Sequence, residues 1–283
     1  MSIKVLTDSA ADLPPSLMQE YGIEMIPLYV FEGDKEYLDG ITLQSDVMFE
    51  AMRRGQVFKT AQAEPAAFKE RFLEYVKNGQ SCIYVGFSSE LSATFQSAVI
   101  AREEVRELYP DCQIELVDTK CASMGQGLVV YHTAKWVKEG LPLAEVVEKT
   151  MHCARHMEHI FTVDDLEYLY RGGRVSRTTA MIGGILNIKP ILHVEKGRLV
   201  PLERVRGKNK VIRRMLEIMR ERGRNLKEQT IGISHGDDLE SANKLMEAIR
   251  KEFGCHDFIM NPIGCAVGAH AGPGTLALFF QNA

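Results

Sequence analysis

The chain lacks long hydrophobic runs, paired cysteines and an excess of positive charge. No apolar stretch of the 283 residues reaches the roughly 18 needed to cross a membrane. The six cysteines contain no C-x-x-C pair, and 34 basic residues stand against 38 acidic ones, for a net charge of -4. With no signal-peptide pattern in its first residues, we expect a cytoplasmic protein with free thiols, without a transmembrane segment or general affinity for nucleic acid. A transient contact with a membrane surface stays open.

Motifs for nucleotides and metals are also scarce. The sequence contains neither G-x-x-x-x-G-K-[ST] nor a strand-linked G-x-G-x-x-G, so a bound polyphosphate is not expected. His152, His156 and His159 fall on one face of an expected helix, with the spacing of some metal pairs. Spacing dictates no further ligand beside them, and we predict neither a metal nor a cofactor.

The first half of the chain alternates short apolar runs with helical patterns, which is typical of a mostly parallel sheet flanked by helices. The expected strands are Ile3–Leu6, Met25–Phe31, Cys82–Phe87 and Ile114–Val117. The expected helices are Pro14–Tyr21, Ser45–Arg54, Pro65–Lys77, Leu91–Leu108, Gly127–Lys138 and Leu143–Ala154. We assign residues 1–156 to this N-terminal α/β domain.

The second half predicts another α/β domain, residues 157–283. Its expected strands are Ile160–Val163, Ile188–Val194, Leu199–Val205, Thr230–Ser234, His256–Asn261 and Thr275–Phe280. Its expected helices are Asp165–Tyr170, Thr178–Leu186, Val211–Arg222 and Leu239–Phe253. The composition of 195–198, Glu-Lys-Gly-Arg, predicts a hairpin turn between two of the strands.

Polar residues follow three of the strands expected in the first half and a further short one, Val57–Lys59, at the strand ends where ligands bind in open parallel sheets. They are Asp8 with its neighbours, Thr60, the segment 88–94 and Asp118 with Thr119. The segment 88–94 also opens a helix, and unpaired backbone N–H groups at such an end favour an anion. The coincidence predicts a polar crevice that would suit a carboxylate, although each residue alone is more typical of a helix cap or turn.

Residues 268–274 read Gly-Ala-His-Ala-Gly-Pro-Gly. Glycines permit positive φ and close approach of a ligand, and a histidine can move a proton near neutral pH. We expect His270 on a stiff loop leading into the core, in a site or in a plain tight turn.

Two further patterns leave alternatives open. Residues 232–236 match G-x-S-x-G, and Asp257 and His270 follow in hydrolase order, so Ser234, Asp257 and His270 form an alternative catalytic triad. A dense basic set can be solvated surface, or can dock an acidic partner or a phosphate. It comprises Arg171, Arg174, Arg177, Lys189, Arg198, Arg204, Arg206, Lys208 and Lys210.

Together the motifs resemble those of the bacterial DegV family, whose characterised members are fatty-acid-binding subunits of fatty acid kinase. The matching segments span nearly the whole chain, and they are 5–14, 26–28, 59–62, 88–98, 117–119, 165–169, 172–176, 186–192, 206–207 and 268–274. The resemblance implies two α/β domains with a long-chain fatty acid buried between them. Carried over by motif, Thr60, Ser92 and His270 would bind its carboxylate.

The resemblance also implies a partner. An ATP-binding kinase subunit would phosphorylate the bound carboxylate to an acyl phosphate, and this chain would be a non-catalytic lipid-binding subunit without a cofactor of its own. Arg174, with Arg204 or Arg206, would dock that partner or handle phosphate. Ala61 and Ala271 stand where the family pattern carries hydroxyls, which weakens the expected polar rim. We expect Phe161, Met181, Ile182, Ile185 and Leu186 to contribute apolar walls.

Overall fold

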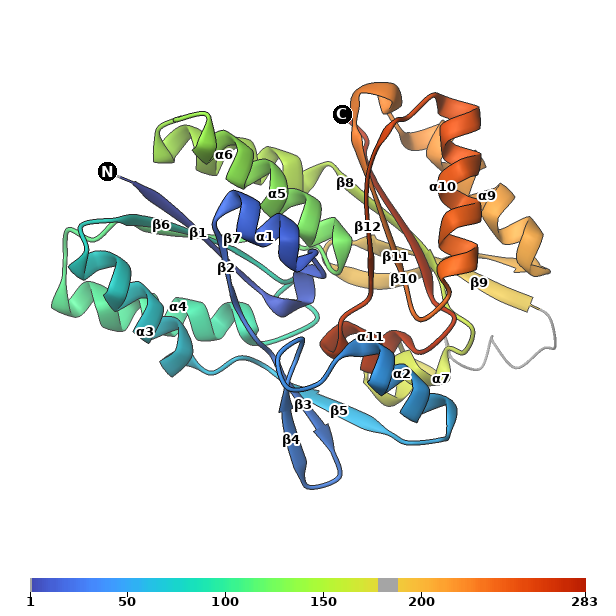
Figure 1. Ribbon diagram of the computed structural model, residues 1–283, viewed down its shortest axis with the longest axis horizontal. Helices are drawn as coiled ribbons and strands as arrows, with labels where there is room; N and C mark the ends of the chain where they lie inside the picture. The colour runs from blue at the N-terminus through green and yellow to red at the C-terminus, as the bar shows by residue number, and fades with distance from the viewer. Residues whose placement is uncertain (1, 178–187) are drawn as a thin grey trace.

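The computed structural model describes residues 2–177 and 188–283 and shows a mixed α/β protein built around two main sheets (Figure 1). The first sheet is four-stranded and fully parallel, in the order β2-β1-β6-β7. Its strands are β1 (Ile3–Asp8), β2 (Ile23–Ile26), β6 (Ser81–Gly86) and β7 (Ile114–Asp118). This confirms the parallel sheet expected from the alternation of strands and helices.

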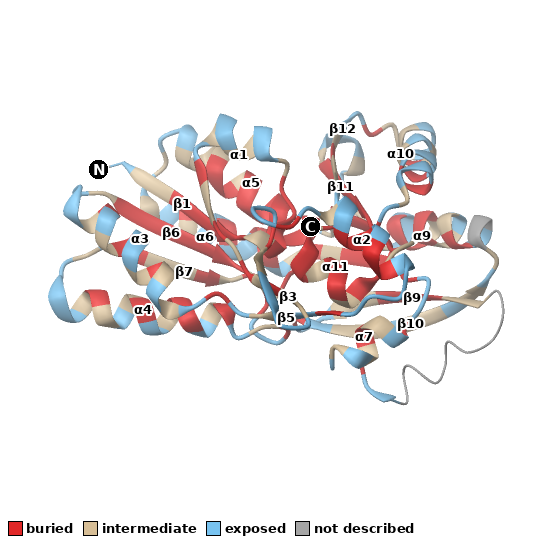
Figure 2. Ribbon diagram, turned by 60° about the horizontal axis from the view of Figure 1, so that its bottom comes forward, coloured by how far each residue is buried: buried red, intermediate tan, exposed pale blue. Residues whose placement is uncertain are grey.

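Helices cover both faces of the parallel sheet. One face carries α3 (Pro65–Lys77) and α4 (Thr94–Leu108), whose Phe68, Phe72 and Ala98 pack against Leu6 and Tyr84 of the strands. The other face carries α1 (Pro15–Tyr21), α5 (Met124–Lys138) and α6 (Leu143–Arg155). The central strands β1 and β6 are therefore buried between two helical layers, as their mostly red ribbons in Figure 2 show.

A small antiparallel sheet projects from the first half of the chain (Figure 1). It contains β3 (Tyr29–Glu32), β4 (Lys35–Leu38) and β5 (Phe58–Ala61), and α2 (Ser45–Arg53) lies between β4 and β5 in sequence. The single strand expected over Met25–Phe31 is wrong, because β2 ends before Pro27 and β3 belongs to this other sheet. Proline has no N–H to donate to a ladder, which favours the break. Thr60 consequently lies on this small sheet and not at the edge of the parallel one.

The second main sheet is six-stranded, in the order β10-β9-β8-β13-β11-β12, and only the β11–β12 pair is parallel. Its strands are β8 (Met157–Thr162), β9 (Ile188–Glu195), β10 (Arg198–Arg206), β11 (Thr230–His235), β12 (Asp257–Pro262) and β13 (Leu276–Gln281). Helices α9 (Lys208–Arg222) and α10 (Leu239–Phe253) pack on one face. The expected hairpin turn is confirmed, with Lys196 and Gly197 at φ of 50° and 84°.

Helix α5 lies between the two main sheets and contacts both. Its buried side chains Met124 and Leu128 belong to the same core as Val5 of the parallel sheet and Phe279 of the mixed one. In the described part of the chain, the remaining helical elements are the short α7 (Glu167–Arg171) and α11 (Cys265–Ala271) and the 3-10 turns η1 (Ser9–Ala11) and η3 (Leu226–Glu228). The change of sheet coincides with the expected division at residues 156 and 157, but the division into domains stays a prediction, because α5 packs on both sides of it.

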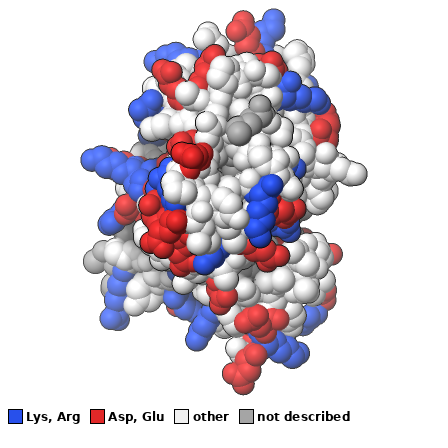
Figure 3. All heavy atoms as spheres, turned by 90° about the vertical axis from the view of Figure 1, so that its left-hand side faces the viewer, with Lys and Arg blue, Asp and Glu red and all other residues white. Residues whose placement is uncertain are grey.

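The surface carries charges of both signs, as the face drawn in Figure 3 shows. All six cysteines are free. In the described ranges, no helix is long and apolar enough to span a bilayer, and no group of three or more His, Cys, Asp or Glu residues is placed to hold a metal ion.

Candidate ligand-binding site

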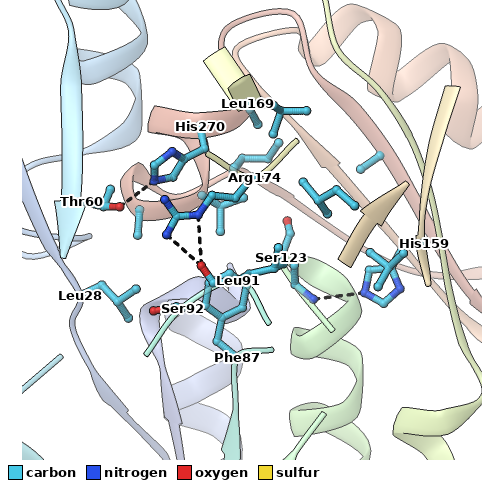
Figure 4. Close-up of a pocket in the computed structure, with 18 of the residues that line it drawn as sticks. Leu28, Thr60, Phe87, Leu91, Ser92, Ser123, His159, Leu169, Arg174 and His270 are labelled. Atoms are coloured by element: carbon cyan, nitrogen blue, oxygen red, sulfur yellow. Dashed lines mark hydrogen bonds between the residues drawn. The ribbon is translucent and has the colours of Figure 1, made fainter. Parts of the chain in front are cut away.

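A cavity of about 140 Å³, as bounded by the described residues, opens where the two main sheets and the small sheet meet (Figure 4). Apolar side chains form most of its wall, among them Leu28, Leu91, Phe161, Leu169, Val194 and Phe279. Its polar groups include Thr60, Ser92, Ser123, His159, Arg174 and His270. The cavity therefore brings together the three residues that the motifs predicted as carboxylate ligands, Thr60, Ser92 and His270. They come from β5, the segment before α4, and α11. Phe161 also lines it, whereas Met181, Ile182, Ile185 and Leu186 lie outside the described residues.

His270 and Thr60 form a direct pair. The Thr60 hydroxyl lies 2.6 Å from His270 Nε2, a hydrogen bond across 210 residues of sequence. The expected loop around His270 is wrong, because residues 265–271 form helix α11 and His270 occupies its last turn. The glycines shape the turn between this helix and β13, where Gly272 and Gly274 have φ of 81° and 82°. Our expectation missed the helix because a seven-residue segment with Gly268 inside it and a glycine at each cap has little helix propensity.

The His270 imidazole is neutral near pH 7. Burial, together with the nearby Arg174 guanidinium, lowers its pKa from 6.5 to about 4. The fixed positive charge of the site is therefore Arg174, which is the single charged side chain among the described residues that line the cavity. An anion bound here meets one cation together with neutral hydrogen-bonding groups.

Arg174 connects two parts of the chain. Its Nε and Nη2 donate to the Leu91 carbonyl oxygen at 3.1 and 2.8 Å, and its Nη1 donates to the Gly172 oxygen at 2.5 Å. Three of the five guanidinium N–H groups are thereby used, and two remain for a ligand. Burial lowers the pKa of Arg174, although an arginine stays protonated at any physiological pH. The side chain is thus held in place before a ligand arrives (Figure 4).

The segment 88–94 differs from the open anion site that we expected. Helix α4 begins only at Thr94, and the N–H groups of Ser89, Glu90, Leu91 and Ser92 already have partners. The Ser92 hydroxyl accepts from Thr94 N at 3.2 Å and pairs with the Thr94 hydroxyl at 2.9 Å. Ser92 therefore satisfies the first N–H of the helix and also lines the cavity, so the segment offers hydroxyls there and not a row of free amides.

The other polar strand ends have structural roles. Asp8 is buried and accepts from the Tyr84 hydroxyl at 2.6 Å and from Phe87 N at 2.9 Å. Asp118 accepts from Ser89 N and pairs with Lys120. Of the four strand ends, three belong to the parallel sheet and Thr60 does not, so the predicted common edge is only partly correct.

His159 lies on the opposite side of the cavity from Thr60 (Figure 4). Its Nδ1 donates to the Met157 carbonyl at 3.1 Å, and its Nε2 accepts from Ala122 N at 3.2 Å, so the ring is neutral. Burial lowers its pKa to about 4. The common helical face expected for His152, His156 and His159 is wrong, because α6 ends at Arg155 and His159 belongs to β8.

The alternative hydrolase triad is not assembled. The Ser234 hydroxyl pairs with Ser123 at 2.9 Å, the Asp257 carboxylate with Thr230 at the far end of β11, and His270 with Thr60. Residues 232–235 continue strand β11, so the G-x-S-x-G match is a strand and not a nucleophile elbow. The Thr60–His270 pair has the geometry of a hydroxyl beside a base. However, none of the described residues lining the cavity is a carboxylate that could orient the imidazole, so the pair lacks the third member of a triad.

A buried polar network behind the cavity was not foreseen. The Ser123 hydroxyl bonds to Asp12 Oδ2 at 2.5 Å as well as to Ser234, and Gly264 N donates to Asp12 Oδ1 at 2.8 Å. Burial, with the charge of Asp39, raises the pKa of Asp12 well above its usual value. Ser123 has φ 53° and ψ -146°, a strained conformation for a residue with a Cβ. The sequence offers no signal for this network, because its members come from distant segments.

Arg204 and Arg206 lie on β10, exposed and outside the lining of the cavity. A role in docking a partner stays a prediction for both.

The DegV family model, described as "Uncharacterised protein, DegV family", matches residues 2–283. The chain belongs to the DegV family. A DegV domain-containing protein of Clostridium perfringens is 41% identical over 279 residues, which are 98% of this chain and 96% of that protein. A fatty acid-binding protein of Thermotoga maritima is 34% identical, over 98% and 96% of the two chains. The structure of a fatty-acid-binding DegV family protein from Thermus thermophilus superimposes with a TM-score of 0.91 at 29% identity, covering both chains completely.

Proposed function

We propose that this DegV protein binds a long-chain fatty acid in the cavity and presents its carboxylate to an ATP-binding kinase subunit. The observation that carries the proposal is the distribution of polarity in the cavity. One side holds Arg174 with the Thr60–His270 pair and Ser92, and apolar side chains form most of the remaining wall. A single anionic head joined to a hydrocarbon chain matches this distribution, and relatives of at least 29% identity bear fatty-acid-binding descriptions.

The hydrocarbon would supply most of the affinity. Burying a methylene is worth about 0.8 kcal/mol, so a long acyl chain contributes on the order of 10 kcal/mol before ordering costs. The carboxylate would set the orientation, because a charge buried without partners is very costly. Arg174 supplies the opposite charge, and the Ser92 hydroxyl and the Thr60–His270 pair each supply a hydrogen bond.

The partner half of the proposal rests on the motifs that resemble the lipid-binding subunits of fatty acid kinase. A carboxylate oxygen of the bound lipid would attack the γ-phosphorus of ATP and form a C(O)O–P bond. The bond from that phosphorus to the β,γ-bridging oxygen breaks, its electron pair stays on ADP, and no proton is required. The sequence has no nucleotide-binding motif, so the kinase subunit would bring the nucleotide.

The binding half is tested by organic extraction of the purified protein followed by mass spectrometry. We expect about one long-chain fatty acid per chain, and much less from Arg174→Ala purified in parallel. An extract without fatty acid, together with no uptake of added oleate, would contradict the proposal. The presentation half is tested by adding kinase subunit and ATP to the loaded protein and trapping acyl phosphate with hydroxylamine.

A further inference from the structure

A second hollow of about 250 Å³, here called the outer hollow, lies directly against the polar side of the lipid cavity. Thr60, Arg174 and His270 line both spaces and form the partition between them. On the far side of the partition, the outer hollow adds Lys59, Tyr168 and Arg171. A carboxylate bound at the partition would therefore have this hollow on its other side.

The charges around the outer hollow are of one sign. Lys59, Arg171 and Arg174 line it, and none of its described lining residues is acidic. Glu167 pairs with Arg171 from outside the lining, at 3.6 Å, with both side chains about half exposed. Such an exposed ion pair is weak, so Arg171 can still attract an anion bound in the outer hollow. The Arg171 guanidinium also lies 5.7 Å from the centre of the Tyr168 ring, which orients it.

We propose that the outer hollow is the binding site for the phosphoryl group that is transferred to the lipid carboxylate, with Lys59 and Arg171 as its ligands beside Arg174. This inference rests on the proposed function, since it supplies that reaction with a place for its second reactant. The carboxylate carries one negative charge and a phosphoryl group about two, and the three cations balance them. Cations placed around a transferring phosphoryl group stabilise the charge that spreads over its oxygens.

The arrangement also explains how a buried carboxylate can react without leaving its site. The apolar chain stays in the inner cavity, and the phosphorus approaches through the outer hollow from the opposite side of the Thr60–His270 pair. After transfer, the phosphoryl group of the acyl phosphate would lie in the outer hollow between Lys59 and Arg171. Both side chains therefore contact the reacting phosphoryl group and make no contact with the hydrocarbon.

The test compares Lys59→Gln and Arg171→Gln with two matched controls. Lys35→Gln removes an exposed lysine from the same small sheet, and Arg213→Gln removes an exposed arginine that, like Arg171, pairs with a glutamate four residues away. Each loaded variant is assayed for acyl phosphate formation over a range of kinase concentrations. We expect the maximal rate to fall at least ~10-fold for the two site variants, while controls and fatty acid retention stay unchanged. If a saturating concentration of kinase restores the rate of a site variant, its side chain docks the kinase and the inference is overturned. An unchanged rate in both site variants would also overturn it.

A second measurement does not depend on the kinase. A long-chain acyl phosphonate mimics the product and cannot be hydrolysed, and its affinity for each variant is measured beside that of the fatty acid. We expect Lys59→Gln and Arg171→Gln to lower the affinity for the phosphonate at least ~10-fold and the affinity for the fatty acid by less than about twofold. Equal affinity of wild type and variants for the phosphonate would overturn the inference. If the kinase assay fails with wild type, the proposed presentation is wrong, and the phosphonate result still decides what the outer hollow binds.

Discussion

Replacing Gly172 by alanine tests the carboxylate site without removing any of its polar groups. A Cβ on Gly172 would lie 2.0 Å from His270 Nδ1 and 2.9 Å from its Cε1. Carbon atoms in favourable contact are about 3.5 to 4.0 Å apart, so the ring would have to move by roughly 1 Å or more. That movement breaks the 2.6 Å contact with Thr60 and displaces Nε2 from the cavity. The backbone accepts alanine, because Gly172 has φ -73° and ψ -11° at the end of α7.

The expected loss follows from the hydrogen bond that the Thr60–His270 pair would make to the lipid carboxylate, because Nε2–H donating to Thr60 leaves the Thr60 hydroxyl proton for the carboxylate. A hydrogen bond to a charged group contributes about 1.5 to 3 kcal/mol, so Gly172→Ala should weaken fatty acid binding about 10- to 100-fold. Affinity is measured by displacement of a fluorescent fatty acid from the delipidated protein. The control ligand is the fatty alcohol of the same chain length, which carries no charge. Its affinity should differ by less than about threefold between Gly172→Ala and wild type.

Two outcomes would refute this reasoning. If Gly172→Ala binds the acid as tightly as wild type, the Thr60–His270 pair does not hold the carboxylate. If the affinities for the acid and the alcohol fall equally, the substitution has deformed the apolar wall, and the loss does not come from the polar groups that would bind the carboxylate. Circular dichroism and the thermal unfolding midpoint of the delipidated variant establish that the fold is retained.

Two further predictions concern groups whose state the structure specifies. The His270 pKa of about 4 lies below its ordinary value of 6.5, so as the pH falls from about 7 to about 4 the unfolded chain takes up the proton first and stability is lost. Between about pH 7 and about pH 4, the free energy of unfolding of the delipidated wild type should therefore fall by on the order of 2 to 3 kcal/mol more than that of His270→Gln. Urea denaturation at both pH values measures the two free energies. If both proteins lose the same stability over this range, the prediction is wrong. Ser123→Ala and Ser123→Gly lose the same hydrogen bonds to Asp12 and Ser234, but only alanine keeps a Cβ at φ 53°. We expect the glycine variant to be more stable by about 1 kcal/mol, and a more stable alanine variant would show that Ser123 is not strained.

Much of the fold could be predicted because its signals are local. The parallel sheet, the hairpin at Lys196 and Gly197 and most helices follow from hydrophobic period and turn residues, which neighbouring positions determine. The break between β2 and β3 was missed, because Met25–Phe31 reads as one apolar run and only the tertiary pairing divides it. Helix α11 was missed for the opposite reason, because it is short and contains Gly268, whose low helix propensity is overridden by packing against α2 and α7.

The site could be predicted only in part. Motifs nominated Thr60, Ser92 and His270, and the structure places all three on one cavity. Sequence reasoning did not show that His270 is neutral, or that Arg174 bridges Leu91 and Gly172, because burial and long-range contacts set both. It passed over Lys59 and missed His159 as a member of the cavity wall. An exposed lysine and a lone histidine have no pattern that separates a site from a surface or a core.

Helix α5 makes the two sheets thermodynamically inseparable. One apolar side of α5 packs on the mixed sheet. Cutting the chain after residue 156 would expose that side to water, so neither half would keep a complete core. The whole chain should therefore unfold in one transition despite its two sheets. A lipid bound at the junction would stabilise that single unit, so loading with fatty acid would raise a single melting temperature.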